Sequence, residues 1–355
     1  MQVFETAERS DALSVLTPYL IPPGSDKVPN LGDGFILRAI ERHLGKFPSG
    51  ASFSSRCVPS DAQKLVLMRS PGIILAGTNQ LNDDFAPWPG MQSDEIRVQP
   101  YVFVPMGIGI HGELERNSQM SAATTEILEL IHERIRFSSW RCPRTVAYLR
   151  RSIPRLAANF LMTGCPTIYD GPLLDSSRFN SGQDIVAVTA TERGDFWDRE
   201  SRTIEFVARK YPRAEKWLVV HQDYSVKRRS WLKGRILRAL NKSADALHAY
   251  AVRRGFTVHT PRSVDEGLWL YRKADMHFGS RLHAHLTVLS QNKRSYLTKV
   301  DERSTGISEH FEFPLCDPAR FEDVLDFDFE RVRQAALRTF PVMQAFIESI
   351  GRSTC

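Results

Sequence analysis

Short apolar runs alternate with amphipathic helical patterns along almost the whole chain, and this alternation limits the folds that the chain can adopt. The apolar runs at 72–77, 101–109, 184–190 and 217–222 have the length of buried strands. Helical patterns lie between such runs, as in LGDGFILRAIERHLG at 31–45. Regular alternation of strand and helix is typical of parallel sheets with helices on both faces. We therefore expect an α/β protein built from doubly wound, Rossmann-like sheets.

Chain length and one irregular segment divide this alternation into two halves. The chain has 355 residues, and a single hydrophobic core rarely extends beyond about 250–300 residues. The segment GPLLDSSRFNSGQ (171–183) is rich in Gly, Ser, Pro and Asn, which is typical of a linker. We predict Rossmann-like domains over 1–178 and 179–325 that face a cleft. A helical segment over 326–355, interrupted near Pro341, is expected to pack back on the core.

Composition excludes several classes of protein. Hydrophobic residues make up 42% of the chain and charged residues 25%, which indicates a globular rather than a disordered protein. The net charge of +6 suits an anionic small molecule, an anionic lipid surface or nucleic acid. The sequence contains no zinc-finger spacing, ribonucleoprotein strand motif or long Lys/Arg block. We therefore expect no nucleic-acid partner.

Cysteine usage and the N-terminal sequence indicate the compartment. Five widely spaced cysteines without a C-x-x-C pair favour a reducing environment. The N-terminal sequence MQVFETAERSD lacks a basic-then-apolar signal pattern, and no apolar run approaches a bilayer-spanning length. These features predict a cytoplasmic protein that at most makes peripheral contact with the inner face of the cell membrane.

The stretch HFGSRLHAH (277–285) contains three histidines and an arginine where a strand pattern meets a helix pattern. The first turn of a helix exposes unpaired backbone N–H groups with a partial positive charge, which is typical of an anion site. Arg281 adds a bidentate donor that matches phosphate or carboxylate. His283 adds a group that can transfer a proton near neutral pH.

Two other interpretations of this stretch stay open at the level of sequence. His277, His283 and His285 could ligate a metal, although their spacing matches no zinc signature and residues two apart on a helix point to different sides. The stretch could also be a helix cap with a solvated arginine and partly buried histidines. We expect no metal and no resident cofactor.

Other polar residues follow or precede predicted elements where ligands bind in doubly wound sheets. Asn30 and Asp33 lie in PNLGDGFI, a tight loop before the first helix, and the alternative is a simple helix cap by Asp33. Asn79 lies in AGTNQL, after a strand pattern. Arg193 follows DIVAVTA and can instead be a surface arginine, and Lys299 follows SYLT.

Taken in order, these segments resemble the polysaccharide pyruvyl transferase family over residues 28–310. NLGDGFILRAI resembles the family's N-x-G-D motif, GIILAGTNQL its strand with a glycine-rich loop, and YVFVPMGIG the following strand with G-x-G. RCPRTVAYL is similar to an R-D-x-x-S segment, TGCP to a G-D-P turn, and TKVDERSTGI to a later basic loop. FGSRLHAHLTVLS resembles the R-x-H motif at the start of a helix, which is the most specific of the set.

The chain departs from the family pattern at three places. Gly-Thr-Asn at 77–79 stands where the family has a glycine triplet, and Cys142 and Cys165 stand where aspartate is usual. These departures fall in the N-terminal half, whose loops are expected to select the acceptor.

The resemblance implies a two-domain fold like that of GT-B glycosyltransferases, and a defined reaction. The enolpyruvyl group of phosphoenolpyruvate would be transferred to two hydroxyls of a sugar, which forms a pyruvate ketal and releases phosphate. The acceptor would be a bacterial surface polysaccharide or its lipid-linked precursor. The alternatives are a GT-B glycosyltransferase that uses a nucleotide-sugar, and a non-catalytic family member in glycan assembly.

The resemblance also implies residue roles. Arg281 and His283 form the catalytic pair: Arg281 binds the phosphate or carboxylate, and His283 is a phosphate ligand and general acid. The remaining residues implied are Ser280, Leu282, Arg193 and Lys299 for phosphoenolpyruvate, and Asn30, Asp33 and Asn79 for the acceptor.

Overall fold

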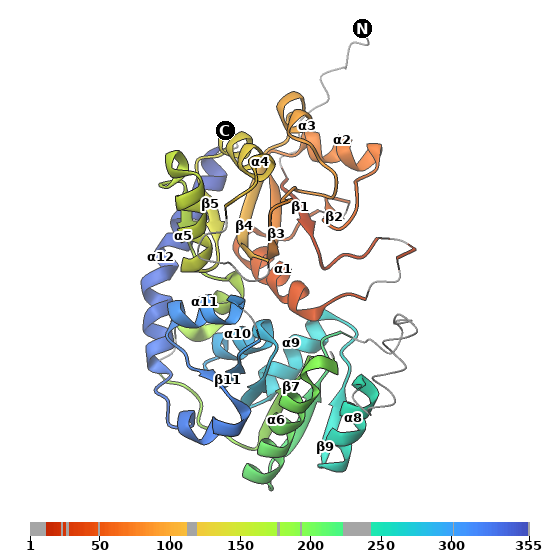
Figure 1. The fold of residues 1–355 in the computed structure, drawn as a ribbon, viewed down its shortest axis with the longest axis vertical. Helices are drawn as coiled ribbons and strands as arrows, with labels where there is room; N and C mark the ends of the chain where they lie inside the picture. Colours follow the sequence, from red (N-terminus) through yellow and green to blue (C-terminus); the bar gives the residue numbers. More distant parts are fainter. Residues whose placement is uncertain are drawn as a thin grey trace. The chain divides into compact units, whose positions relative to one another are not determined.

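The chain forms two compact units, neither of which is contiguous in sequence (Figure 1). Unit 1 comprises Met1–Pro23, Ile36–Pro166 and Arg338–Cys355, and unit 2 comprises Gly24–Phe35 and Thr167–Leu337. The computed structural model describes residues 12–22, 24–25, 28–48, 50–111, 119–175, 178–191, 194–222, 243–300 and 302–353.

This division differs from the predicted boundary at 178/179. The chain leaves unit 1 at Pro166, before the segment that the sequence suggested as a linker. The short segment 24–35 belongs to unit 2, because Leu31 and Phe35 are buried in the core of that unit against Leu268 and Tyr271. A loop-like composition therefore did not mark the point at which the chain changes units.

Unit 1 contains a parallel six-stranded sheet in the order β2-β1-β3-β4-β5-β6. The strands are β1 (Ser14–Thr17), β2 (Ser52–Ser54), β3 (Ile73–Leu81), β4 (Phe103–Ile110), β5 (Ser138–Trp140) and β6 (Phe160–Met162). The α-helices between them are α1 (Leu31–Leu44), whose first residues up to Phe35 belong to unit 2, α2 (Asp61–Arg69), α3 (Ser93–Val98), α4 (Ala122–His132) and α5 (Pro143–Ser152). The 3-10 turn η1 (Pro154–Leu156) follows, and η2 (Pro166–Tyr169) begins at the residue where the chain leaves this unit.

Unit 2 contains a second parallel sheet in the order β12-β11-β10-β7-β8-β9. Its strands are β7 (Ile185–Thr189), β8 (Glu215–Val219), β9 (Phe256–His259), β10 (Met276–Gly279), β11 (Arg294–Thr298) and β12 (Leu315–Cys316). Its α-helices are α6 (Trp197–Lys210), α8 (Ala244–Arg253), α9 (Val264–Lys273), α10 (Leu282–Ser290) and α11 (Glu302–Phe311), with η3 (Pro172–Leu174), η4 (Gly194–Phe196) and η5 (Pro318–Val324).

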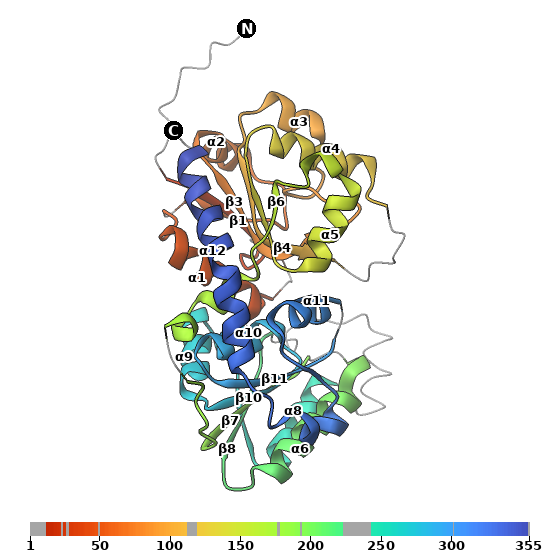
Figure 2. The same cartoon turned by 90° about the vertical axis from the view of Figure 1, so that its left-hand side faces the viewer.

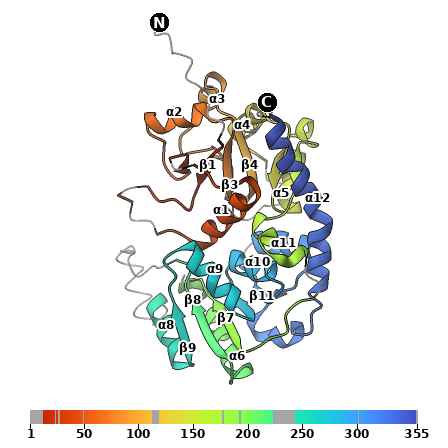
Figure 3. The same ribbon diagram turned by 180° about the vertical axis from the view of Figure 1, so that it is seen from behind.

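The strand order of unit 2 reverses between β7 and β10. From β7 the chain passes through α6 to β8 and then to β9 on one side (Figure 3). Strands β10, β11 and β12 extend the sheet on the other side. This is the strand order of a dinucleotide-binding Rossmann sheet, in which the ligand lies at the reversal, beyond the carboxyl ends of the strands.

Apolar side chains cover both faces of this second sheet. On one face, Ala284 and Val288 of α10 pack with Ala187 and Val219 of the strands. On the other face, Phe206 of α6 lies 5.6 Å from Phe278 of β10, measured between ring centroids, and η5 also packs there. The prediction of two doubly wound, Rossmann-like α/β units is therefore confirmed.

Several predicted helix limits were wrong. Helix α1 begins at Leu31, and Asn30 rather than Asp33 accepts the hydrogen bond of an orphan backbone N–H, so Asp33 lies inside the first turn. Helix α12 (Glu330–Ser353) continues through Pro341 without the predicted interruption. The stretch LKGRILRALNKSADALHAYAVRRG (232–255) also has a helical pattern in the sequence; residues 232–242 lie outside the described residues, and α8 covers Ala244–Arg253 of the remainder.

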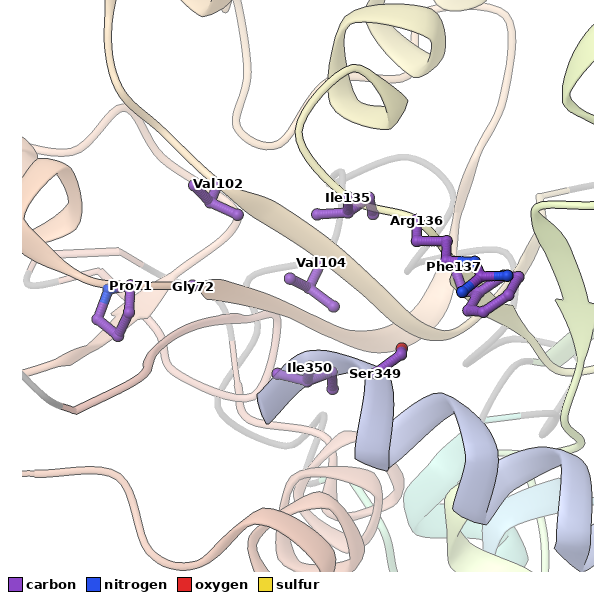
Figure 4. A pocket seen from close by; sticks show the side chains of 9 residues that line it. All are labelled: Pro71, Gly72, Val102, Val104, Ile135, Arg136, Phe137, Ser349 and Ile350. Carbon is purple, nitrogen blue, oxygen red and sulfur yellow. The ribbon is translucent and has the colours of Figure 1, made fainter. Parts of the chain in front are cut away.

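The last helix, α12, is drawn in blue in Figure 2, and its final turns belong to unit 1. Ser349 and Ile350 of this helix line a small pocket with Val104 of β4 and Ile135 (Figure 4). The pocket lies at the amino ends of β3 and β4, which is not the edge at which doubly wound sheets bind ligands. Neither α12 nor any other helix in the described part of the chain is long and apolar enough to cross a membrane.

Candidate functional site

The candidate site of unit 2 lies at the reversal of strand order, where β7 and β10 end side by side. Thr189 and Gly279 are paired at the ends of these two strands, and the Ser280 N–H donates to the Thr189 carbonyl over 3.2 Å. Gly279 has a φ of +143°, and a Cβ at this position would collide with the Thr189 carbonyl oxygen. The sequence needs glycine here so that the turn into α10 can lie directly against β7.

Arg281 is fixed to the end of β7 by two hydrogen bonds. Its backbone N–H donates to Thr189 Oγ1 over 3.4 Å, and its Nε donates to the Ala190 carbonyl over 3.0 Å. It occupies the N-cap position of α10, so Leu282 and His283 form the first helical turn. Arg281 therefore lies at the start of a helix, as the sequence predicted, and its Nε is held against the end of β7.

A buried chain of polar side chains lies behind Arg281. Thr189 Oγ1 is 2.7 Å from His277 Nε2, His277 Nδ1 is 2.8 Å from Ser295 Oγ, and the same hydroxyl is 2.7 Å from His285 Nδ1. Burial lowers the pKa of His277 to about 3 and also lowers the pKa of His285 well below its usual range. Both rings are therefore neutral hydrogen-bonding groups that support the turn.

Two of the three histidines in the metal interpretation have ring nitrogens hydrogen-bonded to protein hydroxyls. His277 and His285 both direct Nδ1 to Ser295. The described residues include no group of three or more His, Cys, Asp or Glu side chains that could hold a metal ion.

The start of α1 lies against His283. Asn30 Oδ1 accepts a hydrogen bond from Gly32 N over 3.1 Å, and Asn30 Nδ2 donates to Asp33 Oδ1 over 3.4 Å. A Cβ at Gly32 would lie 2.9 Å from His283 Nδ1. Asn30 and Asp33, assigned to the acceptor side from the sequence, therefore belong to unit 2 and lie next to a residue assigned to the donor side.

His221 joins these segments, and the sequence analysis did not single it out. Its carbonyl accepts from Leu31 N over 3.1 Å, and its Nε2 lies 2.5 Å from the Tyr271 hydroxyl. Burial lowers the pKa of His221 well below its usual range, and the nearby charge of Arg281 lowers it further. His221 follows β8, so its place at the carboxyl edge was the available signal.

Glu200 is a second residue that sequence reasoning missed. It is fully buried in the first turn of α6, where its carboxylate pairs with the guanidinium of Arg199. Burial raises the pKa of Glu200, whereas Arg199, the Ser280 hydroxyl and the Thr191 backbone lower it in part. The signal was the spacing: Glu200 is four and seven residues before Ile204 and Val207, on the buried face of the helix.

The remaining predicted residues are Lys299, Arg193 and Asn79. Lys299 is exposed just after β11, and its carbonyl accepts from Arg199 Nη1 over 2.9 Å. Arg193 lies outside the described residues. Asn79 belongs to β3 of unit 1, where its Oδ1 accepts a hydrogen bond from the buried Arg141. The structure thus brings together Ser280, Arg281, Leu282, His283, Asn30 and Asp33 in unit 2.

A Rossmann sheet with a cationic helix start at its reversal point defines a class of α/β proteins that bind anionic ligands. Within this class, the family model "Polysaccharide pyruvyl transferase" matches residues 30–301, and the chain belongs to this family. No curated protein matches the chain.

Two solved structures illustrate the structural similarities. UDP-GlcNAc 2-epimerase from Neisseria meningitidis, bound to UDP-GlcNAc, is 11% identical, with a TM-score of 0.46 over 96% of this chain and 100% of that chain. The MnaA–UDP structure from S. aureus is 10% identical, with a TM-score of 0.49 over 94% of this chain and 92% of that chain. UDP-GlcNAc and UDP are the ligands of those two proteins.

Proposed function

We propose that the chain is a phosphoenolpyruvate-dependent transferase that forms a pyruvate ketal on a sugar of a bacterial surface polysaccharide or its lipid-linked precursor. The observation that carries the proposal is the Arg281 guanidinium held at the start of α10, next to His283, in a chain of the pyruvyl transferase family. Phosphoenolpyruvate has a phosphate and a carboxylate close together, and both need cationic or N–H donors.

In the proposed reaction, Arg281 binds the phosphate or carboxylate of the donor, together with Ser280 and the backbone of Leu282. His283 binds the phosphate and, as general acid, delivers a proton to C3, which makes C2 electrophilic. One sugar hydroxyl attacks C2, the C2–O bond to phosphate breaks, and the second hydroxyl attacks C2 to complete the ketal. Of the two protons that the hydroxyls lose, one returns to His283 and the other leaves with the phosphate. Lys299 at the end of β11 is proposed as an additional cation for the donor.

Asn30 and Asp33 are proposed to bind the acceptor. Their support is the contact between the α1 start and His283, because the attacking hydroxyl must lie close to the donor carbon. Asn79 is proposed as a third acceptor ligand.

The test is acceptor-dependent release of phosphate from phosphoenolpyruvate by the purified protein, with a panel of nucleotide-linked and lipid-linked sugars. Arg281→Ala should abolish turnover. Arg294→Ala is the matched control, because this arginine begins β11 and so lies at the amino ends of the strands, whereas Arg281 lies at their carboxyl ends. Thermal stabilisation by UDP or GDP but not by phosphoenolpyruvate would contradict the proposal and favour a nucleotide-sugar donor.

A further inference from the structure

The buried polar chain behind Arg281 has a direction of hydrogen bonding that its members determine. Thr189 Oγ1 has two hydrogen-bond partners in the described part of the chain: the Arg281 backbone N–H at 3.4 Å and His277 Nε2 at 2.7 Å. Thr189 is fully buried, so its hydroxyl proton needs an acceptor within the protein. Of these two partners, only His277 Nε2 can accept. The Thr189 hydroxyl therefore donates to His277.

This direction continues through Ser295 to His285. A neutral histidine that accepts at Nε2 carries its proton on Nδ1, so His277 Nδ1 donates to Ser295 Oγ over 2.8 Å. The Ser295 hydroxyl then donates to His285 Nδ1 over 2.7 Å, which places the proton of His285 on Nε2. The backbone N–H of Arg281 thus determines the tautomers of two buried histidines.

The reverse direction leaves more buried polar atoms unmatched. If His277 Nε2 donated to Thr189, the Thr189 hydroxyl proton and the His285 Nε2 lone pair would both lack a partner. In the direction from Arg281 to His285, one atom remains: His285 Nε2, which has no hydrogen-bond partner among the described residues. The ring of Phe313 lies 4.3 Å from that of His285, between centroids, and an N–H group can make a weak contact with an aromatic face. Because each unmatched buried group costs free energy, the direction that starts at Arg281 is favoured.

We propose that His277, as the Nδ1–H tautomer, is a positioning residue of the donor site that acts through Thr189. The inference rests on the proposed function. By accepting the Thr189 hydroxyl proton, His277 leaves a lone pair of Thr189 Oγ1 for the Arg281 N–H. Arg281 is the N-cap residue of α10, so holding its backbone fixes the point at which this helix begins. His277 is itself fully buried, and its effect reaches the donor through Thr189 and Arg281.

The kinetic test compares His277→Asn with His277→Gln, because the two amides reach different positions of the replaced ring. The Gln amide extends to the position of Nε2 and can accept from Thr189, whereas the shorter Asn amide reaches only the position of Nδ1, next to Ser295. We expect His277→Asn and Thr189→Val each to raise KM for phosphoenolpyruvate about tenfold, with kcat changed less than about threefold. His277→Gln should keep KM within about threefold of wild type.

His132→Asn is the matched control. His132 Nε2 lies 2.9 Å from the Ser138 hydroxyl in unit 1, so this substitution removes the same kind of ring-to-hydroxyl contact in the other unit. It should lower the free energy of unfolding, as His277→Asn does, and leave KM unchanged. An equal KM for His277→Asn and His277→Gln, or an equal rise in KM for His132→Asn, would overturn the inference.

A double variant separates positioning from two independent structural losses. His277→Asn combined with Thr189→Val should be no worse in KM than the more impaired single variant, because the two side chains act as one unit. Multiplied effects of the two substitutions on KM would show that His277 does not act through Thr189.

The direction of hydrogen bonding can be measured in the wild-type protein without any substrate. Long-range proton–nitrogen NMR spectra of protein with isotope-labelled histidine show which ring nitrogen carries the proton, and spectra of His277→Gln and His285→Gln assign the signals. We expect the proton on Nδ1 in His277 and on Nε2 in His285. A proton on Nε2 of His277 would refute the proposed tautomer whatever the substrate.

Amide hydrogen exchange keeps the positioning role separate from the proposed function. Peptides that cover 279–283 should exchange about tenfold faster in His277→Asn than in His277→Gln or His132→Asn. If the wild-type protein does not use phosphoenolpyruvate, the proposed function fails while this comparison still tests the support of the turn. Equal exchange in the three variants would refute the role of His277.

Discussion

Gly32 and His283 meet with no room for a side chain between them: a Cβ at position 32 would lie 2.9 Å from His283 Nδ1 and 3.3 Å from His283 Cβ. The start of α1 and the start of α10 are therefore packed against each other within unit 2. Glycine at this point is required by the neighbour and not by a left-handed backbone, since Gly32 lies inside a helix.

Gly32→Ala should destabilise the protein by about 1–3 kcal/mol, because His283 or the helix start must move to admit a methyl group. The measurement is urea unfolding in the wild-type and His283→Ala backgrounds. With His283 truncated, the same substitution should cost little, since alanine is the better helix former by about 1 kcal/mol. If Gly32→Ala lowers the free energy of unfolding equally in both backgrounds, His283 is not the side chain that the added methyl group meets.

Lys299→Ala should raise KM for phosphoenolpyruvate several-fold and make KM less sensitive to salt. Lys299 is exposed at the carboxyl end of β11, next to β10, where a cation attracts a trianionic donor. Lys273→Ala is the control, since Lys273 is also exposed but ends α9, just before the amino end of β10. Steady-state kinetics at two salt concentrations measure KM for both variants. If KM and its salt dependence are the same in the two variants, Lys299 does not bind the donor.

Thr78→Gly should stabilise the protein by about 1 kcal/mol. A β-branched residue in the left-handed region carries roughly 1–3 kcal/mol of backbone strain, which glycine removes. Part of this gain is lost again because glycine gives the unfolded chain more conformational entropy. Thr78 has a φ of +70° in β3, where the pairing with β4 shifts register. Thr257→Gly, on an exposed position of β9, should instead lose stability. Chemical denaturation of both variants checks the opposite signs.

Stability should fall as the pH is lowered below about 6.5, the ordinary pKa of histidine. Burial lowers the pKa of folded His277 to about 3, so the unfolded chain takes up a proton that the folded chain refuses. The stabilisation is present above the unfolded pKa and is lost as the pH falls toward 3, by about 1.4 kcal/mol for each unit of pKa difference. His277→Gln should flatten this dependence, whereas His248→Gln on α8 should not; denaturation between pH 7.5 and 4.5 measures it.

The turn at Arg281 was predictable because local patterns specify it. A short apolar strand, Gly279 and a helical stripe place Ser280 and Arg281 at a helix start, and the contacts with Thr189 and Ala190 confirm that placement. The partner strand was not predictable, because alternation of strand and helix gives parallel sheets without fixing their order. The reversal of strand order between β7 and β10 is therefore known only from the structure.

The surroundings of His283 were missed for a different reason. The loop before α1 has no periodicity, and Leu31 and Phe35 read as ordinary members of a helical stripe, so nothing in the sequence ties them to Tyr271. Glu200 was hidden by its type, since a charged residue on a helix is usually solvent-exposed. Its spacing from the apolar residues of the helix indicated a buried position, but only the structure shows that the side chain is buried.

The assignment of 24–35 to unit 2 has a consequence for how this protein could be dissected or could have evolved. A fragment that starts at Thr167 would keep Arg281 and His283 but lose residues 24–35, which lie against His283 and pack on Leu268 and Tyr271. Because neither unit is contiguous in sequence, no single cut in the chain yields two fragments that each contain one complete unit. Exchanging one lobe with a homologue would require transplanting that distant dozen residues as well.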